Sequence, residues 1–163
     1  MPIEGVIQPV EIKIDERIRL RKYDGRIDFA LQWYQDIDLV YLVDGVKEVY
    51  SYDKLKRMYD YLNCHGDLYF IEVLENNKYM PIGDVTFYKD DMPIVIGDSK
   101  YHGKHIGRKV ISALVKRGRE LGYNKMYVKE IYDYNIASRK CFESVGFREY
   151  EKTERGNRYV LDL

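Results

Sequence analysis

Two pairs of short segments predict β-strands, and in the first pair apolar and polar residues alternate with a period of two, as in half-buried strands. Residues 10–14 and 18–22 form a first pair, separated by three polar residues that suit a short turn. Residues 68–74 and 81–88 form a second pair, with a turn at residues 75–78. We therefore expect the chain to open with a hairpin and to continue, after an insertion, as an antiparallel meander.

Between these two pairs the period changes to that of a helix. Asp28 introduces one apolar run, the Tyr52-Asp53 pair introduces a second, and residues 36–50 join the two. We expect these two helices to form a lid region beside the sheet.

In the second half of the chain, a strand, a loop and a helix follow one another closely. Residues 94–96 are an apolar run typical of a buried strand, the loop contains Gly97, Gly103 and Gly107, and an apolar stripe with helical spacing then extends to Leu121. Gly122 suits a left-handed cap after this helix.

The start of this helix is a candidate phosphate site. A loop that feeds a helix leaves the first backbone N–H groups without intrahelical partners, and the helix dipole places partial positive charge there. Lys104 and Arg108 add full positive charges at the same end. A diphosphate could be held by the amides and neutralised by these two side chains. Neither a G-x-x-x-x-G-K-[ST] run nor a G-x-G-x-x-G run after a strand occurs in the sequence.

Residues 125–147 repeat the strand, loop and helix arrangement. Residues 126–131 read as a strand, Asn135 as a helix N-cap and Gly146 as the end of a short helix with apolar residues Ala137, Cys141, Phe142 and Val145. If the two strands are parallel neighbours, their carboxyl ends open at one edge, where α/β sheets bind ligands. The tail, around Gly156-Asn157, reads as a last hairpin.

The loop reads His102-Gly-Lys-His-Ile-Gly107, and the second unit reads Asn135-x-x-Ser138-x-x-x-Phe142-x-x-x-Gly146-Phe147. In order and spacing this pair resembles the fingerprint of the GNAT superfamily of N-acetyltransferases, an (R/Q)-x-x-G-x-(G/A) loop followed by N-x-x-(A/S)-x-x-x-Y-x-x-x-G-F. The resemblance implies a mixed α/β fold of GNAT type in one domain, residues 1–163. Its central sheet would be mostly antiparallel, with two splayed parallel strands and about four helices.

The resemblance also implies acetyl-CoA as co-substrate, an amine as acceptor and no metal. The residues that would bind acetyl-CoA are Val95, Ile96, Gly97, His102, Gly103, Lys104, His105, Ile106, Gly107, Arg108, Asn135 and Ser138. His102 and His105 have no third ligand nearby in the sequence that would complete a metal site.

Three residues differ from the family pattern. His102 replaces the usual Arg or Gln, and His105 replaces the usual Gly. Phe142 replaces a tyrosine that the family often uses to protonate the departing thiolate, so another acid would be needed for that role. Tyr134, or its neighbour Tyr132, is the candidate, although a thiol with a pKa near about 8.5 also leaves tolerably as the thiolate.

A base is needed as well, because an amine with a pKa of about 10.4 is protonated at neutral pH. Glu130 is the candidate, since some ribosomal-protein acetyltransferases of this superfamily place a carboxylate at the corresponding position. The alternative is that Glu130 is a solvated or ion-paired strand residue. Asp84 and Asp91 are weaker candidates that we expect at turns or sheet edges.

The acceptor remains open between a small cationic amine and a protein N-terminus. Residues 33–44 interleave aromatic side chains with Asp36, Asp38 and Asp44, which would suit a cationic amine, or which form an ordinary solvated helix end. Two functions other than acetyl transfer are also compatible with the sequence. One is a non-catalytic acyl-CoA sensor or interaction module, and the other is another enzyme that acts on a phosphorylated ligand.

The amino-acid composition and net charge limit the classes of partner that we expect. The 163 residues are 45% hydrophobic with a formal net charge of +0, which gives no basic field for nucleic acid or an anionic membrane. No secretory signal or membrane-spanning run is present in the sequence, so we expect a cytoplasmic protein. Cys64 and Cys141 are expected to be packing residues, and a homodimer is left open.

Overall fold

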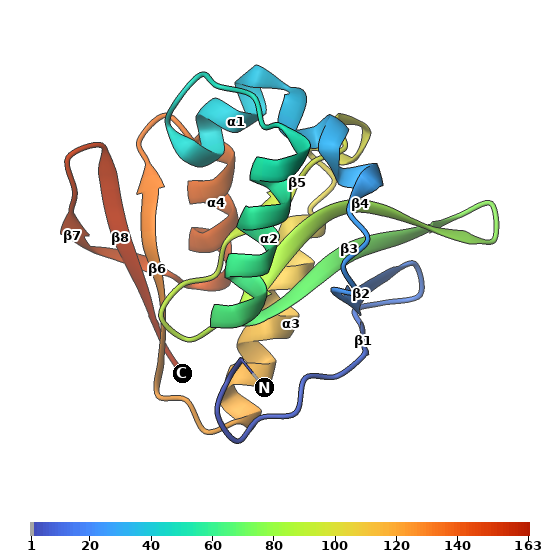
Figure 1. Ribbon diagram of the computed structural model, residues 1–163. Coiled ribbons are helices and arrows are strands. Elements are labelled where there is room, and N and C mark those ends of the chain that lie inside the picture. Colours follow the sequence, from blue (N-terminus) through green and yellow to red (C-terminus); the bar gives the residue numbers. More distant parts are fainter. Residues whose placement is uncertain (1) are drawn as a thin grey trace.

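The computed structural model describes residues 2–163, whose strands form two sheets. The first is antiparallel with the order β1-β2-β3-β4-β5, and its strands are β1 (Glu11–Lys13), β2 (Ile18–Lys22), β3 (Asp67–Glu75), β4 (Lys78–Phe87) and β5 (Ile94–Ile96). The second has the order β6-β8-β7, with β6 (Lys125–Tyr132), β7 (Arg148–Lys152) and β8 (Gly156–Asp162). Figure 1 shows the second sheet beside the first.

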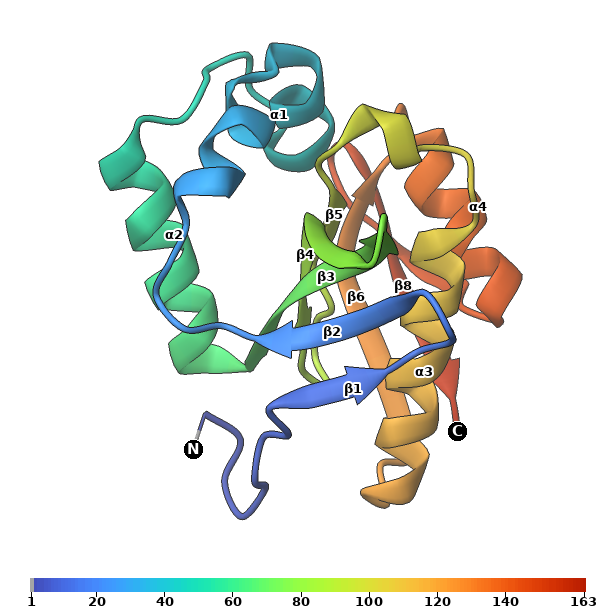
Figure 2. The same cartoon turned by 90° about the vertical axis from the view of Figure 1, so that its right-hand side faces the viewer.

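Helices cover both faces of the first sheet. The lid elements η1 (Asp28–Gln35), α1 (Ile37–Asp44) and α2 (Tyr52–His65) lie on one face, and α3 (Ile106–Glu120) lies on the other with α4 (Ile136–Val145) beside it (Figure 2). A short 3-10 turn, η2 (Ser99–Tyr101), lies in the loop before α3.

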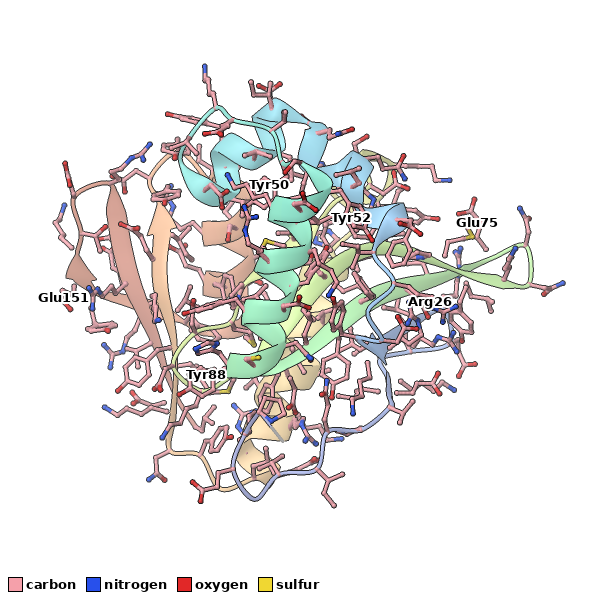
Figure 3. All side chains as sticks on the ribbon, viewed as in Figure 1. Arg26, Tyr50, Tyr52, Glu75, Tyr88 and Glu151 are labelled. Atoms are coloured by element: carbon pink, nitrogen blue, oxygen red, sulfur yellow. The ribbon has the colours of Figure 1, made fainter. Side chains whose placement is uncertain are left out.

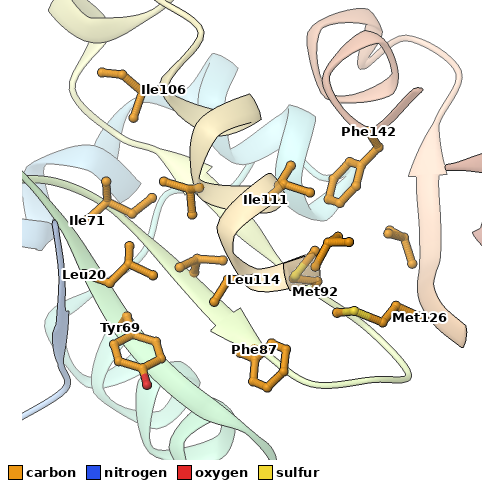
Figure 4. Packing of buried hydrophobic residues seen from close by; sticks show 14 of the residues in the cluster. Leu20, Tyr69, Ile71, Phe87, Met92, Ile106, Ile111, Leu114, Met126 and Phe142 are labelled. Carbon is orange, nitrogen blue, oxygen red and sulfur yellow. The ribbon is translucent and has the colours of Figure 1, made fainter. Parts of the chain in front are cut away.

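The alternation of side chains along β3 divides the core into two clusters. Tyr69 and Ile71 face α3 and pack with its apolar stripe, which includes Ile111 and Leu114 (Figure 4). Leu68 and Phe70 face the other way and pack with the lid aromatics, which include Trp33, Tyr34 and Tyr59. The central sheet therefore holds the lid on one side and the candidate phosphate site on the other.

The two sheets are joined at one end and separate at the other. Near its start β6 is bonded to the connection between β4 and β5, because Tyr127 N–H donates to the Lys89 carbonyl at 2.8 Å. Two residues later, Lys129 N–H donates to the Asp91 carboxylate at 3.0 Å, so a side chain takes the place of the next strand partner. The pairing of β6 with β8 also shifts register between Val128 and Ile131. Beyond this bulge β5 and β6 diverge, which confirms the splayed pair.

Most elements lie where the sequence pattern predicts them. The segment 36–50 was expected to be a connection, but it contains α1, whose first turn is capped by the Asp36 carboxylate. The first lid element is a 3-10 helix, and Gly156 begins β8 and is not part of the turn. No helix in residues 2–163 combines the length and the apolar character needed to cross a membrane.

Candidate functional site

The loop before α3 turns through two left-handed residues. Gly103 has φ 71°, with nothing within 4 Å of the place where a Cβ would stand, so open space lies beside the turn. His105, which caps α3 without a side-chain bond, has φ 61° and ψ 19°, a conformation that glycine adopts without steric cost. His105 therefore reproduces the backbone that the family's glycine would give.

The amides that follow are free to bind a ligand. The His105 carbonyl accepts from Lys109 N–H at 3.2 Å, which leaves the N–H groups before Lys109 pointing out of the helix end. Lys104 and Arg108 are exposed at the same end. Glu75 lies at the end of the β3–β4 hairpin (Figure 3). It holds the loop before α3, because Tyr101 and Lys100 both donate to its carboxylate.

The outer edge of β5 faces the gap. Gly97 N–H donates to the Ile82 carbonyl on β4 at 2.8 Å, so the backbone of Ile96, which points the opposite way, faces β6. The His102 imidazole lies 2.6 Å from the Ile96 carbonyl and ties the loop to the strand end. Val95 is buried under the lid, and a Cβ at Gly97 would collide with the Trp33 ring.

The start of α4 lies across the gap from this edge. The Asn135 side chain caps the helix by accepting from Ser138 N–H at 3.3 Å. Gly107 brings α3 and α4 close together, because a Cβ there would lie 3.2 Å from the Cys141 sulfur. The buried Ile106 anchors the first turn of α3 in the core. The predicted acetyl-CoA residues thus lie at the end of β5, in the loop before α3 and at the starts of α3 and α4, and two of them, Val95 and Ile106, are buried.

Glu130 lies in the bulge where β6 turns away from β5. Its side chain is exposed, and it has no hydrogen bond or ion pair to any residue of the described chain. Its charge nevertheless reaches Tyr132, whose pKa is raised by burial and then by Glu130. The carboxylate is therefore available to an incoming molecule.

The loop after β6 holds the last turn of α1. Tyr134 donates to the Tyr41 carbonyl at 3.2 Å, and the two rings stack at 4.6 Å. Three more side chains donate hydrogen bonds to this helix end. Asn135 donates to the Leu42 carbonyl at 3.2 Å, Tyr132 to the Asp44 carbonyl at 3.3 Å and Arg155 to the Gly45 carbonyl at 2.9 Å. The carbonyls of Leu42, Asp44 and Gly45 are among those that a helix end leaves unpaired, whereas the Tyr41 carbonyl also accepts from Gly45 N–H at 2.9 Å.

The hydroxyl of Tyr134 is thus engaged on both sides, because it also accepts from Arg155 at 3.2 Å. Burial raises the pKa of Tyr134, although Arg155 opposes the shift. Phe142 is buried in the core against Phe147, with ring centroids 5.2 Å apart.

A buried carboxylate under the lid was placed wrongly by the sequence reading. Asp84 was expected at a turn or an edge, but it lies in the middle of β4, between β3 and β5, with 2% of its surface exposed. Its carboxylate accepts from Tyr34 at 2.7 Å and from Tyr59 at 2.8 Å. Burial raises the pKa of Asp84 to about 6, although the two hydroxyls oppose the shift. The only signal in the sequence is a carboxylate inside an apolar strand.

Two smaller expectations are also corrected. Cys64 is exposed and is not a packing residue, and Ala137 is exposed although it was assigned to the apolar side of its helix. Of the three lid carboxylates, Asp36 caps α1 and Asp44 accepts from Tyr50 at 2.5 Å, so both have structural partners. Residues 2–163 contain no group of three or more His, Cys, Asp or Glu side chains placed to hold a metal ion.

Comparison with known proteins agrees with this geometry. The profile of the acetyltransferase (GNAT) family matches residues 29–147, which include the lid, the loop before α3 and the start of α4. The uncharacterized protein MJ1062 of Methanocaldococcus jannaschii is 33% identical over 100 residues, 58% of this chain. The matched region is 20% of the length of that relative.

Two solved structures are similar in fold. A domain from Methanocaldococcus jannaschii superposes with a TM-score of 0.79 at 26% identity, covering 91% of this chain and all of that one. RimL, a ribosomal L7/L12 α-N-protein acetyltransferase in complex with coenzyme A, superposes with a TM-score of 0.73 at 15% identity, covering 94% and 98% of the two chains. At 15% sequence identity, the similarity to RimL is a similarity of fold alone.

Proposed function

Because the chain belongs to the GNAT acetyltransferase family, we propose that it transfers the acetyl group of acetyl-CoA to a primary amine by direct attack in a ternary complex. The observation that carries the proposal is the divergence of β5 and β6 next to the starts of two helices. The gap has backbone groups on the β5 side and a free carboxylate, Glu130, on the β6 side.

The cofactor would lie across the helix ends. Its diphosphate suits the amides of residues 103–108, with Lys104 and Arg108 as counter-charges. Its pantetheine arm would run along the outer edge of β5 at Ile96 and reach Asn135 and Ser138 on the other side. The open space beside Gly103 and the left-handed His105 fit a bulky anion held close to the backbone.

Glu130 would remove the proton from the acceptor ammonium, directly or through a water molecule. The freed nitrogen lone pair attacks the thioester carbonyl carbon, and the nitrogen, now positively charged, gives its second proton to water. The C–S bond breaks as the tetrahedral intermediate collapses to the amide, and the thiolate leaves. The thiolate can leave as such or take a proton from Tyr134, which must first release the Tyr41 carbonyl. The acceptor is a small cationic amine or a protein N-terminus.

A non-catalytic acyl-CoA sensor is the second candidate. It is favoured by the buried Phe142 and by the engaged hydroxyl of Tyr134, which together leave no free hydroxyl at the usual acid position. A sensor would bind acetyl-CoA tightly and release no coenzyme A.

One experiment separates the two functions. Purified protein is mixed with acetyl-CoA and a panel of amines and N-terminal peptides, and the products are read by thiol release and by a mass increase of one acetyl group. Amine-dependent thiol release supports the enzyme, and binding without turnover across the panel supports the sensor.

The cofactor site is tested by calorimetry. Lys104→Glu with Arg108→Glu should weaken acetyl-CoA binding by about tenfold or more, because two phosphate counter-charges become repulsive. Lys152→Glu, an exposed lysine on β7, is the matched control and should bind like the original protein. Equal binding by all three proteins would remove the α3 loop from the proposal.

A further inference from the structure

A second surface, beside α3 and away from the start of α4, forms a groove of about 890 Å³. One wall is the outer face of α3, where Lys109, Ser112 and Lys116 recur at helical spacing, and the other is the β1–β2 hairpin with Ile12 and Ile14. Figure 2 shows this hairpin beside α3. The groove shares only His105 and Arg108 with the proposed acetyl-CoA site.

The groove runs along a free sheet edge. On the inner side of β1, the Val10 carbonyl accepts from Lys22 N–H and Ile14 N–H donates to the Ile18 carbonyl, both at 2.9 Å. Because the backbone of a strand alternates, the N–H and C=O groups of Glu11 and Lys13 point outward. β1 is the edge strand, and in residues 2–163 it pairs with β2 alone. Such an edge can accept one more strand.

The walls carry an excess of positive charge, although the whole chain has a net charge of +0. Five cations line the groove against two carboxylates, Asp15 and Glu120. Asp15 is held by Lys109 at 2.9 Å, whereas Arg108 and Lys116 have no ion-pair partner in the described chain. An occupant of this groove should be acidic.

Apolar side chains at the rim add a second requirement. Ile7 is 82% exposed and Val10 is 73% exposed, the two highest values among the exposed large apolar residues of the described chain. The Ile7 carbonyl accepts from Arg117, which places Ile7 at the α3 end of the groove wall. A small phosphate compound would match the cations but would leave these side chains and the strand edge unused.

We propose that this groove binds an extended, acidic segment of a partner protein, which adds to β1 as a sixth strand of the first sheet. Backbone bonds to Glu11 and Lys13 give the segment its register. Carboxylates of the segment meet Lys116 on α3, and its apolar side chains cover Ile7 and Val10 at the rim.

The proposal is tested with a labelled peptide of about ten residues that alternates valine and glutamate, by fluorescence anisotropy with the full chain. We expect saturable binding whose affinity falls with added salt. The Lys116→Glu variant should bind the peptide about tenfold more weakly, and the Lys152→Glu variant should bind it like the original protein. Lys13→Pro removes an outward N–H without touching the pairs with β2, so it should weaken binding more than Lys13→Ala does.

Control peptides and competing anions distinguish strand addition from plain charge attraction. The same peptide with N-methyl groups along one edge should bind at least about tenfold more weakly, and this arm leaves the protein unaltered. Equal binding of the N-methylated peptide, or of polyglutamate, would overturn strand addition in favour of plain charge attraction. Displacement by tripolyphosphate or by acetyl-CoA would make the groove an anion site or part of the cofactor site, and no binding at millimolar peptide would also overturn the proposal.

Discussion

The Arg155 guanidinium donates a hydrogen bond to the carbonyl oxygen of Gly45 at 2.9 Å, across 110 residues of sequence. The same side chain reaches the Tyr134 hydroxyl at 3.2 Å and lies over the Tyr132 ring. One residue in the turn between β7 and β8 therefore joins the second sheet to the end of α1.

Arg155→Ala should loosen the end of α1 without changing the phosphate site. We expect faster hydrogen exchange of the amides of residues 37–45 and a KM for the amine raised several-fold, with unchanged acetyl-CoA binding. Arg155→Lys should restore part of the effect, because lysine keeps the charge and loses the planar fork. Exchange rates in the Ala variant equal to those of the original chain would contradict this role.

Asp84 predicts a pH dependence of stability. Its pKa is raised from 3.8 to about 6, so the folded state holds the proton more tightly than the unfolded state. Stability should fall as pH rises through this window, by about 3 kcal/mol in total for a shift of about two units. Above pH 6 the buried charge is present at full cost.

The measurement is chemical denaturation from about pH 4 to 7 for the original chain and for Asp84→Asn, whose amide oxygen can still accept from Tyr34 and Tyr59. The difference between their unfolding free energies should change across the window in favour of the variant. Glu154→Gln, at an exposed turn, should show no such change. Parallel pH profiles for the original chain and Asp84→Asn would mean that Asp84 ionises normally.

The sequence predicts those features of this fold that depend on neighbouring residues. Alternation locates the strands, and the Asn135 cap and the left-handed Gly146 follow from residue type and position. Features that depend on strand pairing were missed or misplaced: Asp84 looks like an edge residue until β3 and β5 are seen on either side of it. The contact of Arg155 with Gly45 has no local signal, because it needs two distant turns to meet.

His105 shows that residue type alone does not predict the backbone conformation of the loop before α3. Its residue type differs from the family's glycine, yet its backbone takes the left-handed conformation. His105→Gly should therefore be neutral or stabilising by up to about 1 kcal/mol, whereas His105→Val should destabilise by about 1–2 kcal/mol. Thermal unfolding of both variants tests this, and a large loss with glycine would mean that the imidazole itself holds the loop.

Tyr134→Phe tests the acid role while keeping the ring that stacks on Tyr41. If Tyr134 protonates the thiolate, kcat should fall by about tenfold or more, and Tyr132→Phe should cost no more than about threefold. The reverse order would assign the acid to Tyr132. Small losses in both variants would mean that the thiolate leaves unprotonated.

Glu130→Gln should lower kcat/KM for a strongly basic amine at neutral pH by about 10²-fold or more, because the ammonium must then lose its proton to solvent before it attacks. This loss depends on the protonation state of the substrate, because an amine with a pKa near about 6 is already neutral at pH 7 and needs no base. The loss should therefore be much smaller for such an amine, a contrast that general damage to the site would not produce.

Lys129→Gln is the matched control, because Lys129 is exposed in the same bulge and contributes its backbone N–H to Asp91 whatever its side chain. It should keep both the rate and the pH profile. If Glu130→Gln kept the full rate with the basic amine, the proton would have to leave by another route, and the free carboxylate of Glu130 would have no part in the chemistry.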